Sequence, residues 1–346
     1  MRLNFKDVFK GKNGFEYVFD RGVYKINHPK KEPTSLFKYY SNSRFSYEAL
    51  FENYLYLSHP FDFNDSLDCS ELIWDFSGLT EKDYLSYNIS SKLDKATLKK
   101  KYLKGKLNGF FNLRRNMWIE NTYKLGIVSL TNNPLNKLMW AHYSGESGFM
   151  IELDYKTLID EIKNNNLRTL INYVAYPINY VKRLKQIKIA NKFNSFDVPF
   201  LYSFGTKYKE WKYEEEWRII CFMNNLGVPL SKVSALKKDI VGNSNRKLFY
   251  KKKALKKIIL GMYFFNKSFV KHVSSTTPNN PLIYTLKHSK EAEFINHISK
   301  FYSNNIYLSG VTLHKGQLKR SYEKIYFEKL GYNRFKRVRT GVVKFY

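Results

Sequence analysis

Cysteine is scarce in this 346-residue sequence, which contains only Cys69 and Cys221. Two cysteines cannot build a disulfide framework, so the sequence indicates a reducing compartment and we expect a cytoplasmic protein. Long apolar runs are also absent, because none approaches the roughly 18–20 residues that a membrane-spanning helix needs. Residues 1–7 lack the apolar core of a signal peptide. We therefore expect no membrane partner.

Acidic residues are few compared with basic ones. The sequence has 59 Lys and Arg against 30 Asp and Glu, which gives a formal net charge of +29. Such an excess is typical of proteins that contact a polyanion: nucleic acid, an anionic membrane surface or a phosphorylated ligand. A genome rich in AT codons also adds lysine without any partner, although it does not explain the shortage of acids. The charge alone leaves both explanations open.

Motifs of several common enzyme classes are missing. The sequence has no Gly-Lys-Ser/Thr phosphate-binding loop, no Gly-x-Gly-x-x-Gly, no His-Glu-x-x-His, no Cys-x-x-Cys and no Gly-x-Ser-x-Gly. P-loop NTPases, Rossmann dehydrogenases, zinc hydrolases and α/β-hydrolases are therefore not favoured.

The organisation of the chain favours a mixed fold. A hydrophobic content of 43% is typical of a folded chain. We divide the sequence into an N-terminal extension (1–33), a core domain (34–265) and a basic C-terminal extension (266–346), and a strand at 15–19 would add to an edge. Strands are expected at 36–40, 54–58, 126–130, 148–153, 214–222 and 255–262, and helices at 43–53, 80–122, 134–143 and 203–212. This mixture predicts an α+β (mixed α/β) fold with short mixed or antiparallel sheets and helices packed around them.

Four segments combine polar and aromatic residues near the ends of expected strands, where sites usually form. They are 38–41 (Lys-Tyr-Tyr-Ser), 58–68 (ending in Asn-Asp-Ser-Leu-Asp), 139–152 (opening with Met-Trp-Ala-His-Tyr) and 207–220 (containing Trp-Lys-Tyr-Glu-Glu-Glu-Trp-Arg). In this order and spacing they resemble DUF2971, a bacterial family whose domain has no known function. The resemblance covers roughly residues 34–265. Ser66 departs from the family pattern, which usually has Pro there, whereas Asn64, Asp65 and Asp68 match it.

The fourth segment gathers charge. Side chains alternate along a strand, so Glu214, Glu216 and Arg218 are expected on one face of strand 214–222 and apolar residues on the other. The two carboxylates would lie about 7 Å apart. Arg218 can pair with one of them, while the pKa of the other would be raised by its neighbour. An exposed strand face with a local ion pair explains the same pattern, and both interpretations remain open.

The Glu-x-Glu on a late strand is also remotely similar to the signature of ADP-ribosyltransferases. In those enzymes the second Glu holds the nicotinamide ribose and stabilises an oxocarbenium-like transition state. The resemblance implies an ADP-ribosyltransferase-like core, NAD as cofactor and Glu216 as the main catalytic residue, with Glu214 and Arg218 beside it. It also implies a glycosyltransferase that modifies a macromolecular acceptor and, by analogy with similar toxins, acts in antiphage defence. The expected NAD-pocket residues are Lys38, Tyr39 and Ser58.

Three neighbours in the third segment admit two interpretations. His142 and Tyr143 stand beside Trp140 in the expected helix 134–143. A histidine among aromatic residues is usually packed and hydrogen-bonded. The trio would otherwise stack the nicotinamide or a nucleobase, with His142 and Tyr143 on the acceptor side.

A metal-dependent nuclease is the second hypothesis. Asn64, Asp65 and Asp68 suit a loop held by Asx turns. The two aspartates, joined by Glu214 or Glu216, would also suit Mg²⁺ coordination. A nuclease would fit a basic protein equally well.

A non-catalytic nucleic-acid-binding module is the third hypothesis. Residues 314–346 contain ten Lys and Arg against Glu323 and Glu328, with tyrosines and phenylalanines between them. Phosphate contacts combined with aromatic stacking are typical of nucleic-acid binding. A solvated amphipathic helix pair explains the same pattern. The expected contact residues are Lys315, Lys319, Arg320, Arg334, Lys336, Arg337 and Arg339.

Overall fold

The computed structural model of the chain describes residues 5–88, 93–122, 125–166, 170–190, 192–223, 226, 246–266, 270–274 and 282–344. Helices and short strands mix throughout, and the strands pair in both parallel and antiparallel fashion. This confirms the predicted α+β class. No helix in the described part of the chain is long and apolar enough to cross a membrane.

The chain divides into two compact units, each built from three separate segments. Unit 1 contains Met1–Glu32, Tyr56–Ser129 and Asn166–Lys247, and unit 2 contains Pro33–Leu55, Leu130–Asn165 and Leu248–Tyr346. Both terminal segments that the sequence sets apart therefore fold together with parts of the predicted core.

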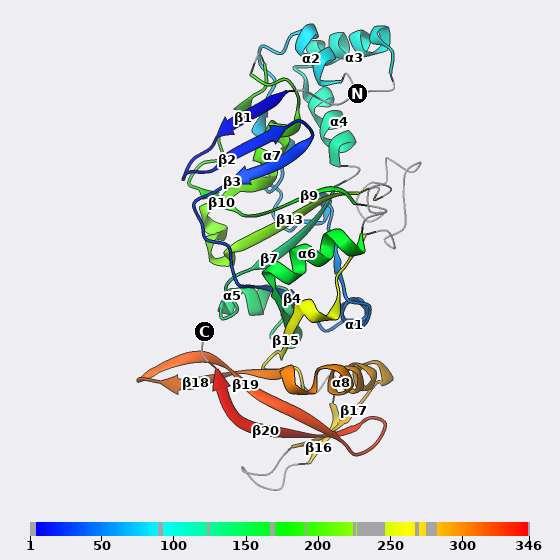
Figure 1. Cartoon of the computed structure of the whole chain (residues 1–346), viewed down its shortest axis with the longest axis vertical. Helices are drawn as coiled ribbons and strands as arrows, with labels where there is room; N and C mark the ends of the chain where they lie inside the picture. Colours follow the sequence, from blue (N-terminus) through cyan, green and yellow to red (C-terminus); the bar gives the residue numbers. More distant parts are fainter. Residues whose placement is uncertain are drawn as a thin grey trace. The chain divides into compact units, whose positions relative to one another are not determined.

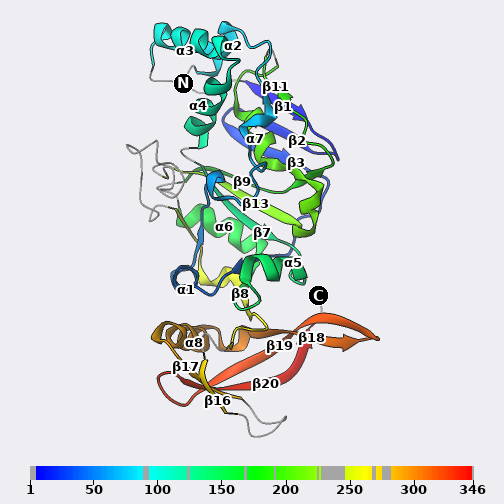
Figure 2. The same ribbon diagram turned by 180° about the vertical axis from the view of Figure 1, so that it is seen from behind.

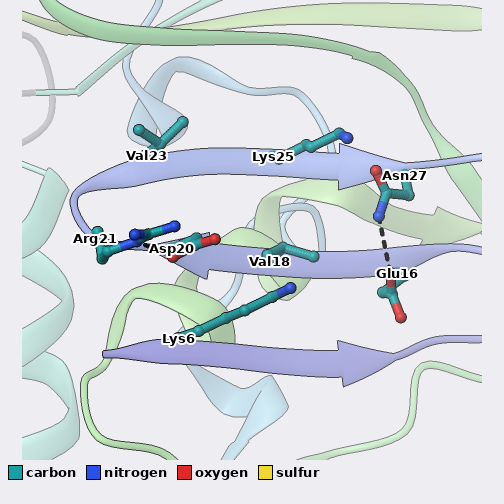
Figure 3. A pocket seen from close by; sticks show the side chains of 8 residues that line it. All are labelled: Lys6, Glu16, Val18, Asp20, Arg21, Val23, Lys25 and Asn27. Carbon is teal, nitrogen blue, oxygen red and sulfur yellow. Dashed lines mark hydrogen bonds and ion pairs between the residues drawn. The ribbon is translucent and has the colours of Figure 1, made fainter. Parts of the chain in front are cut away.

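A three-stranded antiparallel sheet opens unit 1 (Figure 1), formed by β1 (Lys6–Lys10), β2 (Glu16–Asp20) and β3 (Val23–Asn27). The strand expected at 15–19 is β2, which lies between the other two and not at an edge. Alternation along the strands turns Tyr17, Phe19 and Ile26 into the core. The opposite face carries an open hollow whose lining mixes both signs of charge (Figure 3), so it favours no ligand of one sign.

The strand β13 lies between β7 and β9 in unit 1. It runs antiparallel to β9, with Arg218 opposite Tyr176, and it begins at Glu216 instead of Glu214. Side chains on both of its faces are buried, so the interpretation as an exposed strand face is wrong. The helix α7 packs against β1 and β2. The bounds are β6 (Trp74–Asp75), β7 (Leu125–Thr131), β9 (Leu170–Pro177), β10 (Asn179–Val181), β11 (Ile187–Lys188), α7 (Asp197–Gly205), β12 (Thr206–Tyr208) and β13 (Glu216–Met223).

Three helices confirm the predicted helical region of unit 1: α2 (Glu81–Tyr87), α3 (Lys95–Leu107) and α4 (Phe111–Thr122). Asp94 caps α3 by accepting from the backbone N–H of Thr97. Gly105 lets α3 and α4 cross closely, because a Cβ at this position would lie 3.0 Å from the Cβ of Leu113. The two helices form a helical hairpin.

Unit 2 is built on a sheet with the strand order β16-β17-β20-β19-β18-β15-β8-β4. The helices α1 and α8 cover one face, where Tyr47 stacks on both Phe149 and Phe294. The other face receives Trp140, which packs edge-on against Tyr39. The bounds are β4 (Ser35–Tyr40), α1 (Arg44–Phe51), β5 (Tyr54–Tyr56), β8 (Phe149–Asp154), α6 (Tyr155–Asn165), β14 (Lys247–Phe249), β15 (Leu255–Leu260), β16 (Val270–Ser274), β17 (Ile283–Leu286) and α8 (Ser289–Tyr302).

The expected helix 134–143 forms only in part. Asn136 caps a short helix, α5 (Lys137–Met139), which continues as a π-helix over Trp140–Ser144. Gly145 ends it in the left-handed region, with φ of 57°.

The C-terminal region forms three antiparallel strands of unit 2 (Figures 1 and 2), which we call the basic sheet: β18 (Ile306–His314), β19 (Gln317–Lys329) and β20 (Arg334–Lys344). The interpretation as an amphipathic helix pair is therefore wrong. A tight turn at Lys315 and Gly316, both with positive φ, joins the first two strands. The helix α8 packs against β18 and β19.

Candidate functional site

The fourth motif segment folds as a turn followed by a strand. The helix expected at 203–212 is interrupted, because α7 ends at Gly205 and β12 occupies Thr206–Tyr208. A 3₁₀ turn then spans Lys209–Glu214, and Glu215 adopts a left-handed φ of 42° before β13 begins. This reversal brings Glu214 and Glu216 to neighbouring buried positions although only Glu216 belongs to the strand.

Arg218 lies at the centre of a buried charge network, which we define as Asp68, Lys207, Glu214, Glu216 and Arg218. Its guanidinium donates to both carboxylate oxygens of Glu216, from Nε at 2.7 Å and from Nη2 at 3.1 Å. It also donates to both oxygens of Asp68, with an Nη1–Oδ1 distance of 2.9 Å. Arg218 is only 1% exposed, so these carboxylates replace the water that a guanidinium otherwise needs.

Lys207 is the second cation of the network. Its Nζ lies 2.8 Å from Glu214, 3.4 Å from Asp68 and 3.5 Å from Glu216. The ring of Trp211 covers the same ammonium at 4.7 Å from its centroid. Sequence reasoning gave Lys207 no role. It lies on β12, and the residues between it and Glu214 form a turn whose geometry the sequence pattern did not predict.

The two cations decide the ionisation of Glu216. Burial alone would raise the pKa of Glu216, but Arg218 and Lys207 outweigh burial and lower this pKa from 4.5 to about 2. Burial opposes the charge on Arg218 as well, yet Asp68 and Glu216 raise the pKa of Arg218 well above its usual value. Of the two glutamates, Glu216 is the one that Arg218 contacts, and its carboxylate is ionised at neutral pH.

The second motif segment contributes Asp68 to the network but not Asp65. Asp65 accepts a hydrogen bond from the backbone N–H of Leu67 at 2.9 Å, which is the Asx turn expected for a loop former. No group of three or more His, Cys, Asp or Glu side chains is placed to hold a metal ion in the described ranges of the chain. The Mg²⁺ ligand set that the nuclease hypothesis needs is therefore not assembled among these residues.

Ser58, one of the expected NAD-pocket residues, pairs through its backbone with Ile127.

The third motif segment lies in unit 2, as do Lys38 and Tyr39. Trp140 is fully buried, and its Nε1 donates to the Pro134 carbonyl at 3.1 Å and to the Tyr322 hydroxyl at 3.3 Å. His142 is exposed and Tyr143 is half-buried. Trp140 is thus part of the core of unit 2, whereas His142 faces solvent.

Arg320 connects the basic sheet to the third motif segment. Its guanidinium donates to both carboxylate oxygens of Glu146, at 3.0 and 2.6 Å, and to Ser309 at 2.9 Å. It also lies 5.3 Å from the centroid of the Trp140 ring. Arg320 is buried, so it anchors the sheet instead of standing free for a ligand. Sequence reasoning gave Glu146 no role, although it lies within the third motif segment, between the Met-Trp-Ala-His-Tyr sequence and the strand that follows.

The other expected nucleic-acid residues fall into two groups. Lys336 pairs with Glu328 at 2.8 Å and Arg339 pairs with Glu323, while Arg337 stacks over Tyr284. Those that are exposed and have no acidic partner within 4 Å among the described residues are Lys315, Lys319 and Arg334.

Comparison with known proteins supports the family resemblance. Residues 139–219 match the model of the family described as protein of unknown function (DUF2971). The matched residues include the third motif segment and all but the last residue of the fourth, and so confirm the predicted resemblance in this part of the chain. The similarity to ADP-ribosyltransferases stays a prediction. No curated protein matches the chain, and no solved structure matches it either.

Proposed function

We propose that the protein binds nucleic acid through the basic sheet of unit 2. The observation that carries this proposal is how charge is distributed over the three strands. Glu323 and Glu328 are occupied by Arg339 and Lys336. The exposed cations that remain have no acidic partner within 4 Å among the described residues: Lys315, Lys319, Lys329, Arg334 and Lys344. Each is free to replace a counterion of a phosphate backbone.

Exposed aromatic side chains on the same strands favour a single-stranded ligand. Tyr326 on β19 is 39% exposed, and Tyr332, in the turn before β20, is 65% exposed. Base stacking on such rings is sequence-tolerant and contributes about 1–3 kcal/mol per base. A duplex keeps its bases stacked on one another, so it would use the cations but not the tyrosines.

Fluorescence anisotropy with a labelled single-stranded oligonucleotide, measured over a series of salt concentrations, tests this proposal. The triple variant Lys315→Ser/Lys319→Ser/Arg334→Ser should bind more weakly, with a slope of log K against log salt reduced by about 2, because each lost phosphate contact removes about 0.7 from the slope for single strands. Lys156→Ser/Lys163→Ser on α6, two exposed lysines of the same unit, is the matched control. An unchanged slope in the triple variant, or no binding at low salt, would refute the proposal.

A second candidate function is the NAD-dependent ADP-ribosyl transfer predicted from the Glu-x-Glu pattern. One observation favours it: the lowered pKa keeps Glu216 ionised, as a carboxylate that stabilises an oxocarbenium ion must be. Glu216 is, however, only 4% exposed and paired with Arg218, so transfer would require this shell to open. The geometry favours nucleic-acid binding for this reason.

Incubation of the purified protein with labelled NAD and a cell lysate tests the transferase. Wild-type protein should consume NAD and label a macromolecule, and Glu216→Gln should stop both. Glu215→Gln, which changes the exposed neighbour, is the control. If the wild-type protein consumes no NAD, the transferase function is refuted.

A further inference from the structure

The helical hairpin of α3 and α4 in unit 1 exposes apolar side chains at its tip. Leu98 and Tyr102 face inward, and the opposite side of α3 carries Leu103, which is 55% exposed, and Leu107, which is 89% exposed. Phe111, the first residue of α4, is 57% exposed. Leu103 and Leu107 stand four residues apart and therefore lie on one side of the helix. A hairpin that buried its apolar surface only within unit 1 would not place three large side chains here.

The same tip is strongly basic. Lys99 pairs with Glu81 at 2.9 Å, and Lys101 lies 3.8 Å from Glu120. In the second half of α3 and directly before that half, three more lysines are exposed and have no acidic partner within 4 Å in the described part of the chain: Lys100, Lys104 and Lys106. Exposed apolar side chains and lysines therefore lie close together in sequence at the end of α3 and the start of α4.

We propose that this tip docks on an anionic membrane surface, with the three apolar side chains entering the boundary between headgroups and acyl chains. The pattern of apolar residues beside lysines on a helix matches that boundary, which offers an apolar layer directly below negative charge. A phosphate backbone would complement only the lysines, since aliphatic side chains such as Leu103 and Leu107 do not stack on bases. The sequence-based expectation of no membrane partner rested on missing spanning and signal segments, and a docked hairpin needs neither.

Vesicle flotation with the full chain tests this docking. The protein, treated with nuclease, is mixed with vesicles of equal parts phosphatidylglycerol and phosphatidylcholine, or of phosphatidylcholine alone. We expect binding to the anionic vesicles only. Leu107→Ser/Phe111→Ser should weaken this binding about tenfold or more, because the apolar contribution is lost. Phe45→Ser, which removes a side chain 77% exposed on α1 of unit 2, is the matched control and should bind like the wild type.

A reporter separates insertion from simple electrostatic adsorption. A Leu107→Trp variant should be quenched by brominated acyl chains beyond the quenching of the wild-type tryptophans. Lys100→Ser/Lys104→Ser/Lys106→Ser should reduce binding to the anionic vesicles and make it less sensitive to salt. The proposal is overturned if the anionic vesicles do not bind, if Leu107→Ser/Phe111→Ser binds as tightly as the wild type, or if the reporter is not quenched. The last two outcomes would indicate adsorption of a basic surface alone.

Discussion

The buried charge network of unit 1 and the basic sheet of unit 2 treat positive charge in opposite ways. In unit 1, Lys207 and Arg218 are almost completely buried among three carboxylates. In the basic sheet, Lys315, Lys319 and Arg334 are exposed to water and have no acidic partner within 4 Å in the described ranges of the chain. A buried cation has exchanged its water for fixed partners, so its removal damages the fold. An exposed cation keeps its water exchangeable, so its removal should damage binding and leave the fold intact.

The largest effect should come from the centre of the buried charge network. Arg218→Met would leave Asp68, Glu214 and Glu216 with Lys207 as their one remaining cation in the network, and we expect a loss of about 3–5 kcal/mol in the free energy of unfolding. Urea unfolding followed by circular dichroism measures it. Lys319→Met, the exposed counterpart in unit 2, should change stability by less than about 0.5 kcal/mol. Equal free energies of unfolding for the two variants would contradict the distinction between a buried, structural cation and an exposed one.

Acid should destabilise unit 1 through a buried histidine. His59 is fully buried, and its Nδ1 accepts from the backbone N–H of Phe61 at 3.1 Å. Burial, reinforced by Arg246, lowers the pKa of His59 from 6.5 to about 3. Between pH 6.5 and pH 3, the imidazole of His59 is therefore protonated in the unfolded chain but neutral in the folded chain. The free energy of unfolding falls as the pH drops through this range.

At pH 5 the free energy of unfolding should be about 2 kcal/mol lower than at pH 7, since each pH unit below 6.5 removes about 1.4 kcal/mol. Urea unfolding at pH 7 and pH 5 measures it. His59→Asn keeps an acceptor near the Phe61 N–H but cannot take up the proton, so its stability should depend less on pH. The same pH dependence in both proteins would mean that His59 does not carry the effect.

Arg320 is the exception within the basic sheet, and it sharpens the comparison. Arg320 forms an ion pair with Glu146, which is partly exposed. The variant Arg320→Gln loses this pair, and its free energy of unfolding should fall by about 1–2 kcal/mol. In oligonucleotide binding, the slope of log K against log salt should be the same for Arg320→Gln as for the wild-type protein. A reduced slope with unchanged stability would instead make Arg320 a phosphate contact.

The smallest effect should come from an exposed ion pair of unit 1. Lys99 and Glu81 lie 2.9 Å apart, but both side chains are open to water. Lys99→Ala should change the free energy of unfolding by less than about 0.5 kcal/mol, because water screens the pair and its side chains lose entropy when they meet. Thermal unfolding checks this value. A larger loss would show that exposure alone does not separate structural from free cations.

Local patterns predicted much of the regular structure. Apolar runs placed β4, β7, β8, β13 and β15 close to their observed bounds, since a buried strand needs little beyond its own sequence. The basic sheet was missed because Lys and Arg interrupt the alternation of β19 and β20, whose exposed faces mask the strand period. The π-helix at Trp140–Ser144 depends on the cap at Asn136 and on packing of Trp140, neither of which a period reveals.

The candidate site shows the same limit. Alternation correctly grouped Glu216 with Arg218, because both lie on one strand. The pairing of Arg218 with Asp68 spans 150 residues of sequence, and only the folded chain brings the two together. The raised pKa expected for the glutamate that does not pair with Arg218 stays a prediction. The sequence did not reveal that Lys207 helps to lower the pKa of Glu216.

The interleaving of the units has a consequence for how this protein emerges from the ribosome. The chain passes between the units at 32/33, 55/56, 129/130, 165/166 and 247/248. Asp68 is synthesised long before Arg218, so its carboxylate must remain hydrated, and unit 1 incompletely packed, through most of translation. Contacts of such long range also slow folding. A chain interrupted before residue 218 would therefore be an unfinished protein and not a smaller stable one.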